Sequence, residues 1–240
     1  MTLFVSDTAE EVARGAADDA SEVIRTDKRA AVMFAVGESP TGLYAELADR
    51  RRSGTLDTSR IRAVQLDEYL GVAAEDERSF YGWLRREALD PLGIPLERTT
   101  ALHGDAPDAV AECARYERAV KEGGGIDVAI LGIGTNGHLG FNEPPSDATA
   151  PTRVVQLADE TIESNARYWG GRERVPTRGI TAGMRVILAA RRIVVVVTGP
   201  LKSEILHRAL EDEVTADLPA SWLRTVPNVR VYCDRAAWDG

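Results

Sequence analysis

Several features that define whole classes of proteins are scarce or missing in this 240-residue sequence. Its two cysteines, Cys113 and Cys233, lie far apart and lack metal-ligand spacing, so we expect reduced, partly buried thiols in a cytoplasmic protein rather than a disulfide framework. The longest strongly apolar run covers only residues 193–197, far too few to cross a bilayer. The N-terminus lacks a basic region followed by a long apolar stretch, so we expect no signal peptide.

Positive charge is also in short supply, since the formal net charge is −9 at pH 7. An acidic chain gains nothing from the phosphate attraction that drives non-specific nucleic-acid binding, and the basic run at residues 50–52 fits a solvated helix end. No stretch rich in proline, glycine or serine separates two units, and no repeat is visible. With 44% hydrophobic residues, the chain is predicted to form one large domain over residues 1–240.

What the sequence does contain is an alternation of apolar runs with helical patterns. Continuous apolar runs are typical of strands buried on both faces, and they occur at residues 30–36, 61–66, 126–131, 192–198 and 228–233. Helical patterns occur at residues 8–25, 40–51, 79–89, 108–121, 181–190 and 200–210. This order predicts an α/β fold with a mostly parallel, doubly wound, Rossmann-like sheet and helices on both of its faces.

Ligands bind such sheets beyond the carboxyl ends of the strands, and the richest of these places is residues 131–145, LGIGTNGHLGFNEPP. It holds Asn136, His138 and Glu143 among four glycines, which allow a loop to turn tightly and aim several polar groups at one point. A histidine can move protons near neutral pH, and Glu143 could hold the His138 ring in one tautomer. A surface histidine is the alternative, which the glycines and the carboxylate make the weaker one.

Acidic and glycine-rich segments follow two other predicted strands. The loop GESPTG, residues 37–42, offers backbone N–H groups and a helix N-terminus, which suit a phosphate, although an ordinary turn also fits. Asp67 follows the next predicted strand and is a candidate general base, with Glu68 expected to point the opposite way. For this acidic pair, a helix cap or a surface turn is the alternative.

Two basic residues are further candidates. Lys202 lies in the first turn of a predicted helix, where its charge opposes the helix dipole unless an anion binds nearby. A solvated lysine explains that position equally well. Arg167 stands on a predicted helix among aromatic residues and is uninformative by itself.

Taken together, these stretches resemble the glucosamine-6-phosphate deaminase family, also called the isomerase/deaminase family. The resemblance runs from about Ala31 to Asp234 and includes AVGESPTGLYAEL, VQLDEYLGV, TRVVQLADETIESNARYW and VTGPLKSEIL. Its specific part is GHLGFNEP. The 6-phosphogluconolactonases, a sister family on the same fold, share the glycine-rich GH element but do not continue into FNEP.

The resemblance implies roles for the acid–base residues in converting glucosamine 6-phosphate to fructose 6-phosphate and ammonia. Asp67 corresponds to the base that moves a proton between C2 and C1 of the opened sugar. His138 corresponds to the acid–base group that opens the ring, and Glu143 to the carboxylate that tunes it. Asn136 stands where many members of the family have aspartate. The resemblance implies neither a cofactor nor a metal, and the sequence has no metal-ligand cluster.

The resemblance also implies a phosphate site and a moving segment. Ser39, Gly42, Arg167 and Lys202 correspond to the phosphate-binding set, and residues 153–184 to a mobile lid. Glu38 departs from the small or hydroxyl residues usual in the phosphate loop, and we expect its carboxylate to point away from the phosphate.

Three other functions stay open at this stage. The same fold could hydrolyse 6-phosphogluconolactone, or deaminate another amino-sugar phosphate such as galactosamine 6-phosphate. A non-catalytic sugar-phosphate-binding domain is the third, but it calls for a DNA-binding module, and the first 30 residues hold only one predicted helix. The resemblance permits a monomer or a homo-oligomer, and the sequence does not decide between them.

Overall fold

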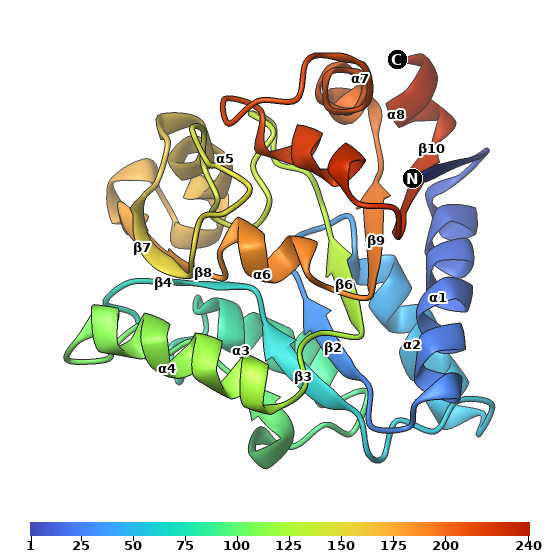
Figure 1. The fold of residues 1–240 in the computed structure, drawn as a ribbon, viewed down its shortest axis with the longest axis horizontal. Helices are drawn as coiled ribbons and strands as arrows, with labels where there is room; N and C mark the ends of the chain where they lie inside the picture. Colours follow the sequence, from blue (N-terminus) through green and yellow to red (C-terminus); the bar gives the residue numbers. More distant parts are fainter.

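Two β-sheets organise the computed structural model, which describes residues 1–240 (Figure 1). The larger sheet has seven parallel strands in the order β1-β10-β9-β6-β2-β3-β5, and the smaller has three antiparallel strands in the order β4-β8-β7. The strands are β1 (Thr2–Ser6), β2 (Ala31–Phe34), β3 (Arg62–Gln65), β4 (Asp67–Tyr69), β5 (Thr99–Thr100), β6 (Val128–Leu131), β7 (Arg153–Gln156), β8 (Arg178–Thr181), β9 (Arg192–Val197) and β10 (Val229–Asp234). The predicted parallel α/β fold is confirmed.

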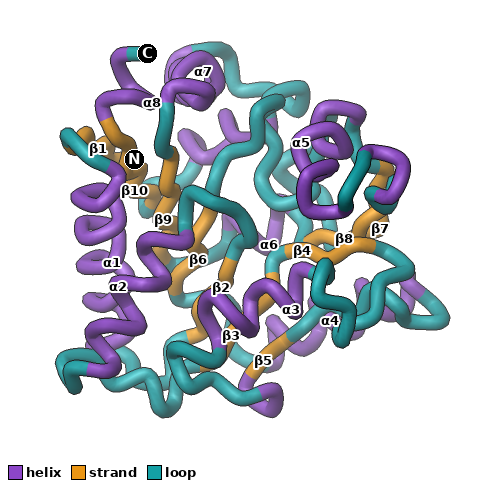
Figure 2. Tube along the Cα trace, turned by 180° about the vertical axis from the view of Figure 1, so that it is seen from behind, coloured by secondary structure: helices purple, strands orange, loops and turns teal.

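Helices cover both faces of the large sheet, as the rear view also shows (Figure 2). The α-helices are α1 (Ala9–Thr26), α2 (Thr41–Arg52), α3 (Phe80–Leu84), α4 (Ala109–Glu122), α5 (Asp159–Trp169), α6 (Met184–Leu188), α7 (Ser203–Glu211) and α8 (Arg235–Asp239). Short 3₁₀ or π turns are η1 (Arg85–Leu89), η2 (Leu96–Arg98), η3 (Arg172–Arg174), η4 (Pro200–Lys202) and η5 (Pro219–Thr225). Helices α1, α2 and α3 pack on one face, and α4, α6, α7 and α8 on the other.

The sequence of β2 shows why this sheet must be covered on both sides. Its residues AVMF are all buried, and alternate side chains of a strand point to opposite faces. Val32 and Phe34 pack with α1 and α2, whereas Ala31 and Met33 pack in the cluster that includes α4 and α7. Because every side chain of the strand is apolar, each face buries a hydrophobic surface.

The strand order creates a crevice beside β2 and β6. On one side of β2 the sheet continues with β3 and then β5. On the other side β6 is followed by β9 and β10, and β1 forms that edge. The loops that follow β2 and β6 therefore diverge from the same point of the carboxyl edge. Crevices of this kind are where open α/β sheets bind ligands.

The small sheet carries a separate structural unit beside this edge. Only Leu66 separates β3 from β4, so the chain passes directly from the large sheet into the small one. The unit contains β7, α5, η3 and β8, and it has its own apolar cluster, which includes Tyr69, Phe141 and Trp169. In Figure 1 it lies to the left of β6 and β9, around the labels α5, β7 and β8.

Some predicted element boundaries were wrong. A helix was expected over residues 181–190, but Thr181 ends β8, where it pairs with Asp67, and α6 begins only at Met184. The close approach of Gly183 to the Pro151 backbone, where a Cβ would lie 2.1 Å from the carbonyl carbon, marks the break between them. The helix expected from Pro200 begins as the 3₁₀ turn η4. Strands β1, β4, β5, β7 and β8 were not predicted.

Candidate active site

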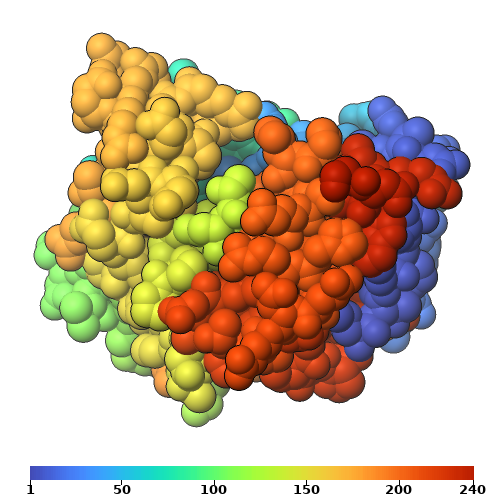
Figure 3. Space-filling model, turned by 90° about the horizontal axis from the view of Figure 1, so that it is seen from above, coloured from blue at the N-terminus to red at the C-terminus, as the bar shows by residue number.

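A cavity of about 610 Å³ opens at the carboxyl edge of the large sheet, where β2, β3, β6 and β9 end. Its wall consists of the loops at residues 35–40, 132–135 and 198–202, the side chains of Asp67 and His138, and one side of α5. Seen from above, the α5 segment, in yellow, and the segment around residue 200, in orange, face each other across a hollow (Figure 3). The cavity is large enough for a small metabolite.

Asp67 is a buried carboxylate that makes no side-chain hydrogen bond within the chain and lines the cavity. Burial raises its pKa well above the usual range of an aspartate, and the nearby charges of Glu68 and Glu143 add to the rise. Glu68 points the other way, as predicted, and accepts backbone hydrogen bonds from Phe80 and Tyr81, each at 2.9 Å. The two neighbouring acids therefore have different roles: Glu68 caps the start of α3, and Asp67 faces the cavity.

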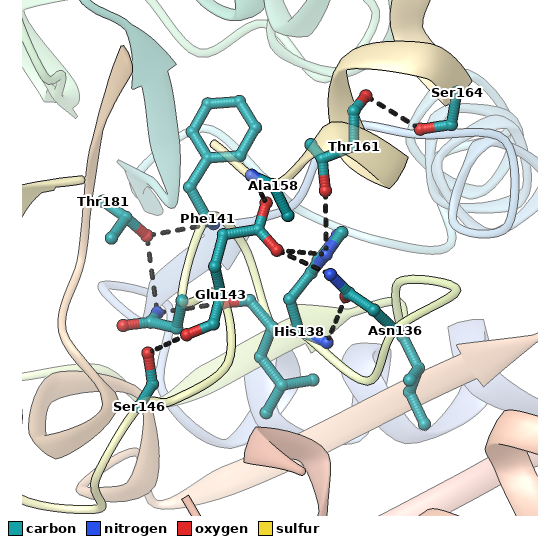
Figure 4. Close-up of polar contacts among 12 residues, drawn as sticks. Asn136, His138, Phe141, Glu143, Ser146, Ala158, Thr161, Ser164 and Thr181 are labelled. Atoms are coloured by element: carbon teal, nitrogen blue, oxygen red, sulfur yellow. Dashed lines mark hydrogen bonds and ion pairs between the residues drawn. The ribbon is translucent and has the colours of Figure 1, made fainter. Parts of the chain in front are cut away.

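His138 is held from behind by a network of polar side chains (Figure 4). Its Nδ1 lies 3.3 Å from Glu143 Oε2 and 3.3 Å from Thr161 Oγ1. Asn136 donates from Nδ2 to Glu143 Oε2 at 2.8 Å, and its Oδ1 accepts a hydrogen bond from the His138 backbone N–H at 3.2 Å. With Nδ1 engaged on this side, Nε2 is the ring nitrogen left for proton exchange in the cavity.

The ionised form of Glu143 is strongly favoured. Burial on its own raises its pKa, but the hydrogen bond and charge of His138, followed by hydrogen bonds from Thr161 and Asn136, outweigh it and lower the pKa to about 2. Asp67 and Glu143 therefore have pKa values displaced in opposite directions. Such a divergence is typical of carboxylates with different roles at one site.

The glycines of the loop after β6 allow this close packing. A Cβ on Gly134 would lie 2.2 Å from the His138 ring, so no larger residue fits without moving the ring. Gly140 has φ of +58° and would bring a Cβ within 2.9 Å of Leu66. Asn142 then anchors the end of the loop, since its amide donates to the carbonyls of Leu139 and Ala182, each at 2.8 Å.

Basic side chains line the end of the cavity around Glu38 and Ser39. Lys202 is half-buried and donates from Nζ to the Ile133 carbonyl at 2.7 Å, so it reaches across from the end of β9 to the end of β6. Burial lowers its pKa, and the charge of Glu38 opposes that change. Ser39 and Arg167 also line this end. The structure thus brings Ser39, Lys202 and Arg167 to one side of the cavity that holds Asp67 and His138.

Two residues of the loop after β2 lie differently from what the sequence suggested. Glu38 does not point away from the basic residues: its Oε1 lies 2.7 Å from Arg167 Nη2, because α5 brings that guanidinium over the loop. Gly42, expected in the phosphate-binding set, is exposed on α2 and does not line the cavity. A Cβ there would lie 3.0 Å from Ala13 Cβ, so its small size serves the packing of α2 against α1.

Sequence reasoning missed the polar face of α5. Thr161, Ser164, Asn165 and Tyr168 all line the cavity, and they recur at the i, i+3, i+4 and i+7 positions that share one helix face. This spacing was visible in the sequence. Its importance was not, because nothing local indicates that this face turns toward His138.

No group of three or more His, Cys, Asp or Glu side chains is arranged to hold a metal ion. No helix combines the length and apolar character needed to span a membrane. Cys113 and Cys233 are both buried and unpaired.

A family model described as glucosamine-6-phosphate isomerases/6-phosphogluconolactonase matches residues 5–232. The chain belongs to this family. Within it, the glucosamine-6-phosphate deaminase of Geobacillus sp. (strain WCH70) is 36% identical, and the match covers 99% of this chain and 94% of that protein. The family membership predicted from GHLGFNEP and the accompanying motifs is confirmed.

Solved structures of the family share the fold. The structure of a monomeric glucosamine-6-phosphate deaminase superposes with a TM-score of 0.96 at 34% identity, covering 99% of this chain and 98% of the other. The 6-phosphogluconolactonase of Trypanosoma brucei superposes with a TM-score of 0.75 at 22% identity, covering 98% and 97%. The isomerase/lactonase family thus spans two chemistries on one fold, and the deaminase is the nearer of these two structures.

Proposed function

We propose that the protein is a glucosamine-6-phosphate deaminase, which converts glucosamine 6-phosphate and water to fructose 6-phosphate and ammonia. One observation carries the proposal: a carboxylate with no side-chain hydrogen-bond partner in the chain, Asp67, shares a cavity with His138 and with the basic side chains of Lys202 and Arg167. An aldose–ketose isomerisation needs a base beside a bound, anionic sugar. The names of the similar deaminases support the same substrate.

The phosphate of the substrate is proposed to bind at the basic end of the cavity. Lys202 and Arg167 supply positive charge, and the loop that contains Ser39 supplies hydroxyl and backbone donors ahead of α2. Anchoring the phosphate there leaves the sugar carbons to extend toward Asp67 and His138. Binding energy from a group remote from the reaction then positions C1 and C2.

Ring opening is proposed to use His138. The pyranose opens when the C1 hydroxyl loses a proton and the ring oxygen gains one, and an imidazole can carry out both transfers. Glu143 and Thr161 hold Nδ1 and keep the ring oriented, while Asn136 fixes both the carboxylate and the loop backbone. The open-chain aldehyde is the product of this step.

Isomerisation is proposed to use Asp67. Its carboxylate removes the proton from C2 while the C1 oxygen takes a proton from the ammonium group of the substrate, giving an enolamine with a hydroxyl on C1. Asp67 then returns its proton to C1, giving an iminium group at C2. Water adds to the iminium carbon, and ammonia leaves with the remaining proton as the C2 ketone forms. Burial suits the aspartate to this task, because a raised pKa makes its carboxylate a stronger base near neutral pH.

Residues 153–184 are proposed to act as a lid. The segment lines the cavity through α5, and it supplies four of the seven buried residues of the apolar cluster beside the cavity. Closure would exclude water from the enolamine, which reacts unproductively if it is protonated in the wrong place.

The buried, unpaired cysteines are in keeping with the expected cytoplasmic location.

An ammonia-coupled assay against a panel of sugar phosphates tests the function. We expect turnover of glucosamine 6-phosphate, with fructose 6-phosphate formed in equal amount. Galactosamine 6-phosphate and 6-phosphogluconolactone serve as the comparison substrates. Faster deamination of galactosamine 6-phosphate would show that this sugar is the preferred substrate. Lactone hydrolysis without ammonia release would assign the protein to the lactonases. Sugar-phosphate binding without turnover would favour a non-catalytic domain.

A further inference from the structure

Glu38 holds a position that the proposed reaction does not explain. It is an exposed acidic residue in the loop after β2, where an anionic substrate is proposed to bind, and its side chain is 73% exposed. A carboxylate there repels a phosphate. Glu38 therefore either weakens phosphate binding or has a role that offsets this repulsion.

The polar contacts of the Glu38 side chain are with two residues of the lid segment. Its Oε1 lies 2.7 Å from Arg167 Nη2 and 3.4 Å from the hydroxyl of Tyr168, which donates to it. Arg167 in turn donates to that hydroxyl at 2.7 Å and lies over the Tyr168 ring, with 4.6 Å between Cζ and the ring centroid. Glu38 thus ties the loop after β2 to α5 and occupies the guanidinium that faces the cavity.

We infer that Glu38 is an internal competitor of the substrate phosphate for Arg167, and that it sets the affinity of the site for phosphorylated ligands. This inference rests on the proposed function. In the structure Glu38 forms its ion pair with Arg167, whereas Lys202 donates to the Ile133 carbonyl and forms no ion pair. The arriving phosphate carries more charge than the carboxylate and can accept from Arg167 and Lys202 together, so it displaces Glu38.

The exchange also links binding to the lid. The Glu38–Arg167 ion pair joins the loop after β2 to α5. A phosphate that binds both Arg167 and the loop breaks this ion pair and connects the same two segments itself. Exposed ion pairs are individually weak and are screened by salt, so the pair can be broken by a bound dianion. Glu38 therefore weakens ground-state binding, and its effect belongs in KM and in phosphate affinity.

Glu38→Gln tests the inference, with Glu163→Gln as the matched control. Like Glu38, Glu163 pairs with an exposed arginine, in its case Arg172 at 3.2 Å, but Glu163 lies on the lid segment and does not line the cavity. Both variants remove one negative charge, so general charge effects cancel. Calorimetry with inorganic phosphate gives a dissociation constant without any turnover, and the ammonia assay gives KM.

We expect Glu38→Gln to lower the phosphate dissociation constant and KM by about threefold to tenfold at low ionic strength, and by less at high salt. Glu163→Gln should leave both unchanged. In an Arg167→Gln background the gain from Glu38→Gln should be at least about threefold smaller, since there is no guanidinium to release. Unchanged or weaker phosphate binding in Glu38→Gln, or an equal gain in both backgrounds, overturns the inference.

The outcomes separate this inference from the proposed function. If the wild-type protein releases no ammonia but Glu38→Gln still tightens phosphate binding through Arg167, the function is wrong and the competition stands. If ammonia is released and phosphate affinity does not respond to Glu38, the function stands and the competition is wrong.

Discussion

Replacing Glu143 with glutamine tests how the carboxylate behind His138 acts, because the side chain keeps its size and loses its charge. The pKa of Glu143 in the folded protein is about 2, against an ordinary value of 4.5. Burial opposes this change, and the hydrogen bond and charge of His138, aided by Thr161 and Asn136, produce it. A lowering of this size corresponds to about 3 kcal/mol in favour of the ionised folded state.

The pH dependence of the effect has a definite sign. Since folding lowers the pKa of Glu143, the stabilisation is complete above the unfolded value and is lost as the pH falls from about 5 toward 2. Glutamine can keep some of the hydrogen bonds, so we expect Glu143→Gln to be less stable by about 1–3 kcal/mol at pH 7. The difference should shrink as the pH is lowered below about 4.

Urea unfolding followed by tryptophan fluorescence, repeated over a series of pH values, measures this difference. Glu163→Gln, whose carboxylate is exposed beside Arg172, is the control and should have little effect at any pH. In the ammonia assay, kcat of Glu143→Gln should fall about 10²-fold or more, because His138 loses the anion that orients its ring. A stability difference independent of pH, together with an unchanged kcat, would refute this account of the network.

Three further predictions concern the same cavity. The acid limb of the kcat/KM profile should lie above the ordinary aspartate range, because the raised pKa of Asp67 means that the base is lost earlier as pH falls; a limb near pH 4 would contradict this. Gly134→Ala should lower kcat more than tenfold while the protein remains folded by circular dichroism, since the new Cβ displaces the His138 ring. Thr161→Val should reduce kcat by less than Glu143→Gln does, because it removes a neutral contact 3.3 Å from Nδ1; an equal loss would shift the orienting role to Thr161.

The large sheet was predictable because its strands carry their own signal. A run such as Ile193 to Val197 is apolar on both faces, and only a strand between two helical layers buries it completely. Strand β1 lacks that signal: it lies at the edge of the sheet, and Phe4 and Val5 are about 40% exposed. The small sheet was missed because β4 has only three residues and β8 runs directly toward α6, so neither stands out as an apolar run.

The site was predictable to the extent that it lies at strand ends. Asp67 and His138 follow β3 and β6, and the carboxyl ends of parallel strands meet at one edge. The contacts made by α5 could not be predicted in the same way, because they depend on how residues 153–184 pack against the large sheet. The Glu38–Arg167 pair joins residues 129 positions apart and reverses the expected direction of the Glu38 side chain. Family motifs indicated which residues matter, and tertiary packing decided what they touch.

Ammonia release by Asp67→Asn is the most direct test of the central claim that this carboxylate transfers the proton between C2 and C1. Asparagine has nearly the same shape and cannot act as a base, and Asp67 makes no side-chain hydrogen bond whose loss would unfold the chain. We expect a folded protein that still binds inorganic phosphate and whose turnover of glucosamine 6-phosphate falls at least about 10³-fold. Ammonia release at the wild-type rate by this variant would contradict the account.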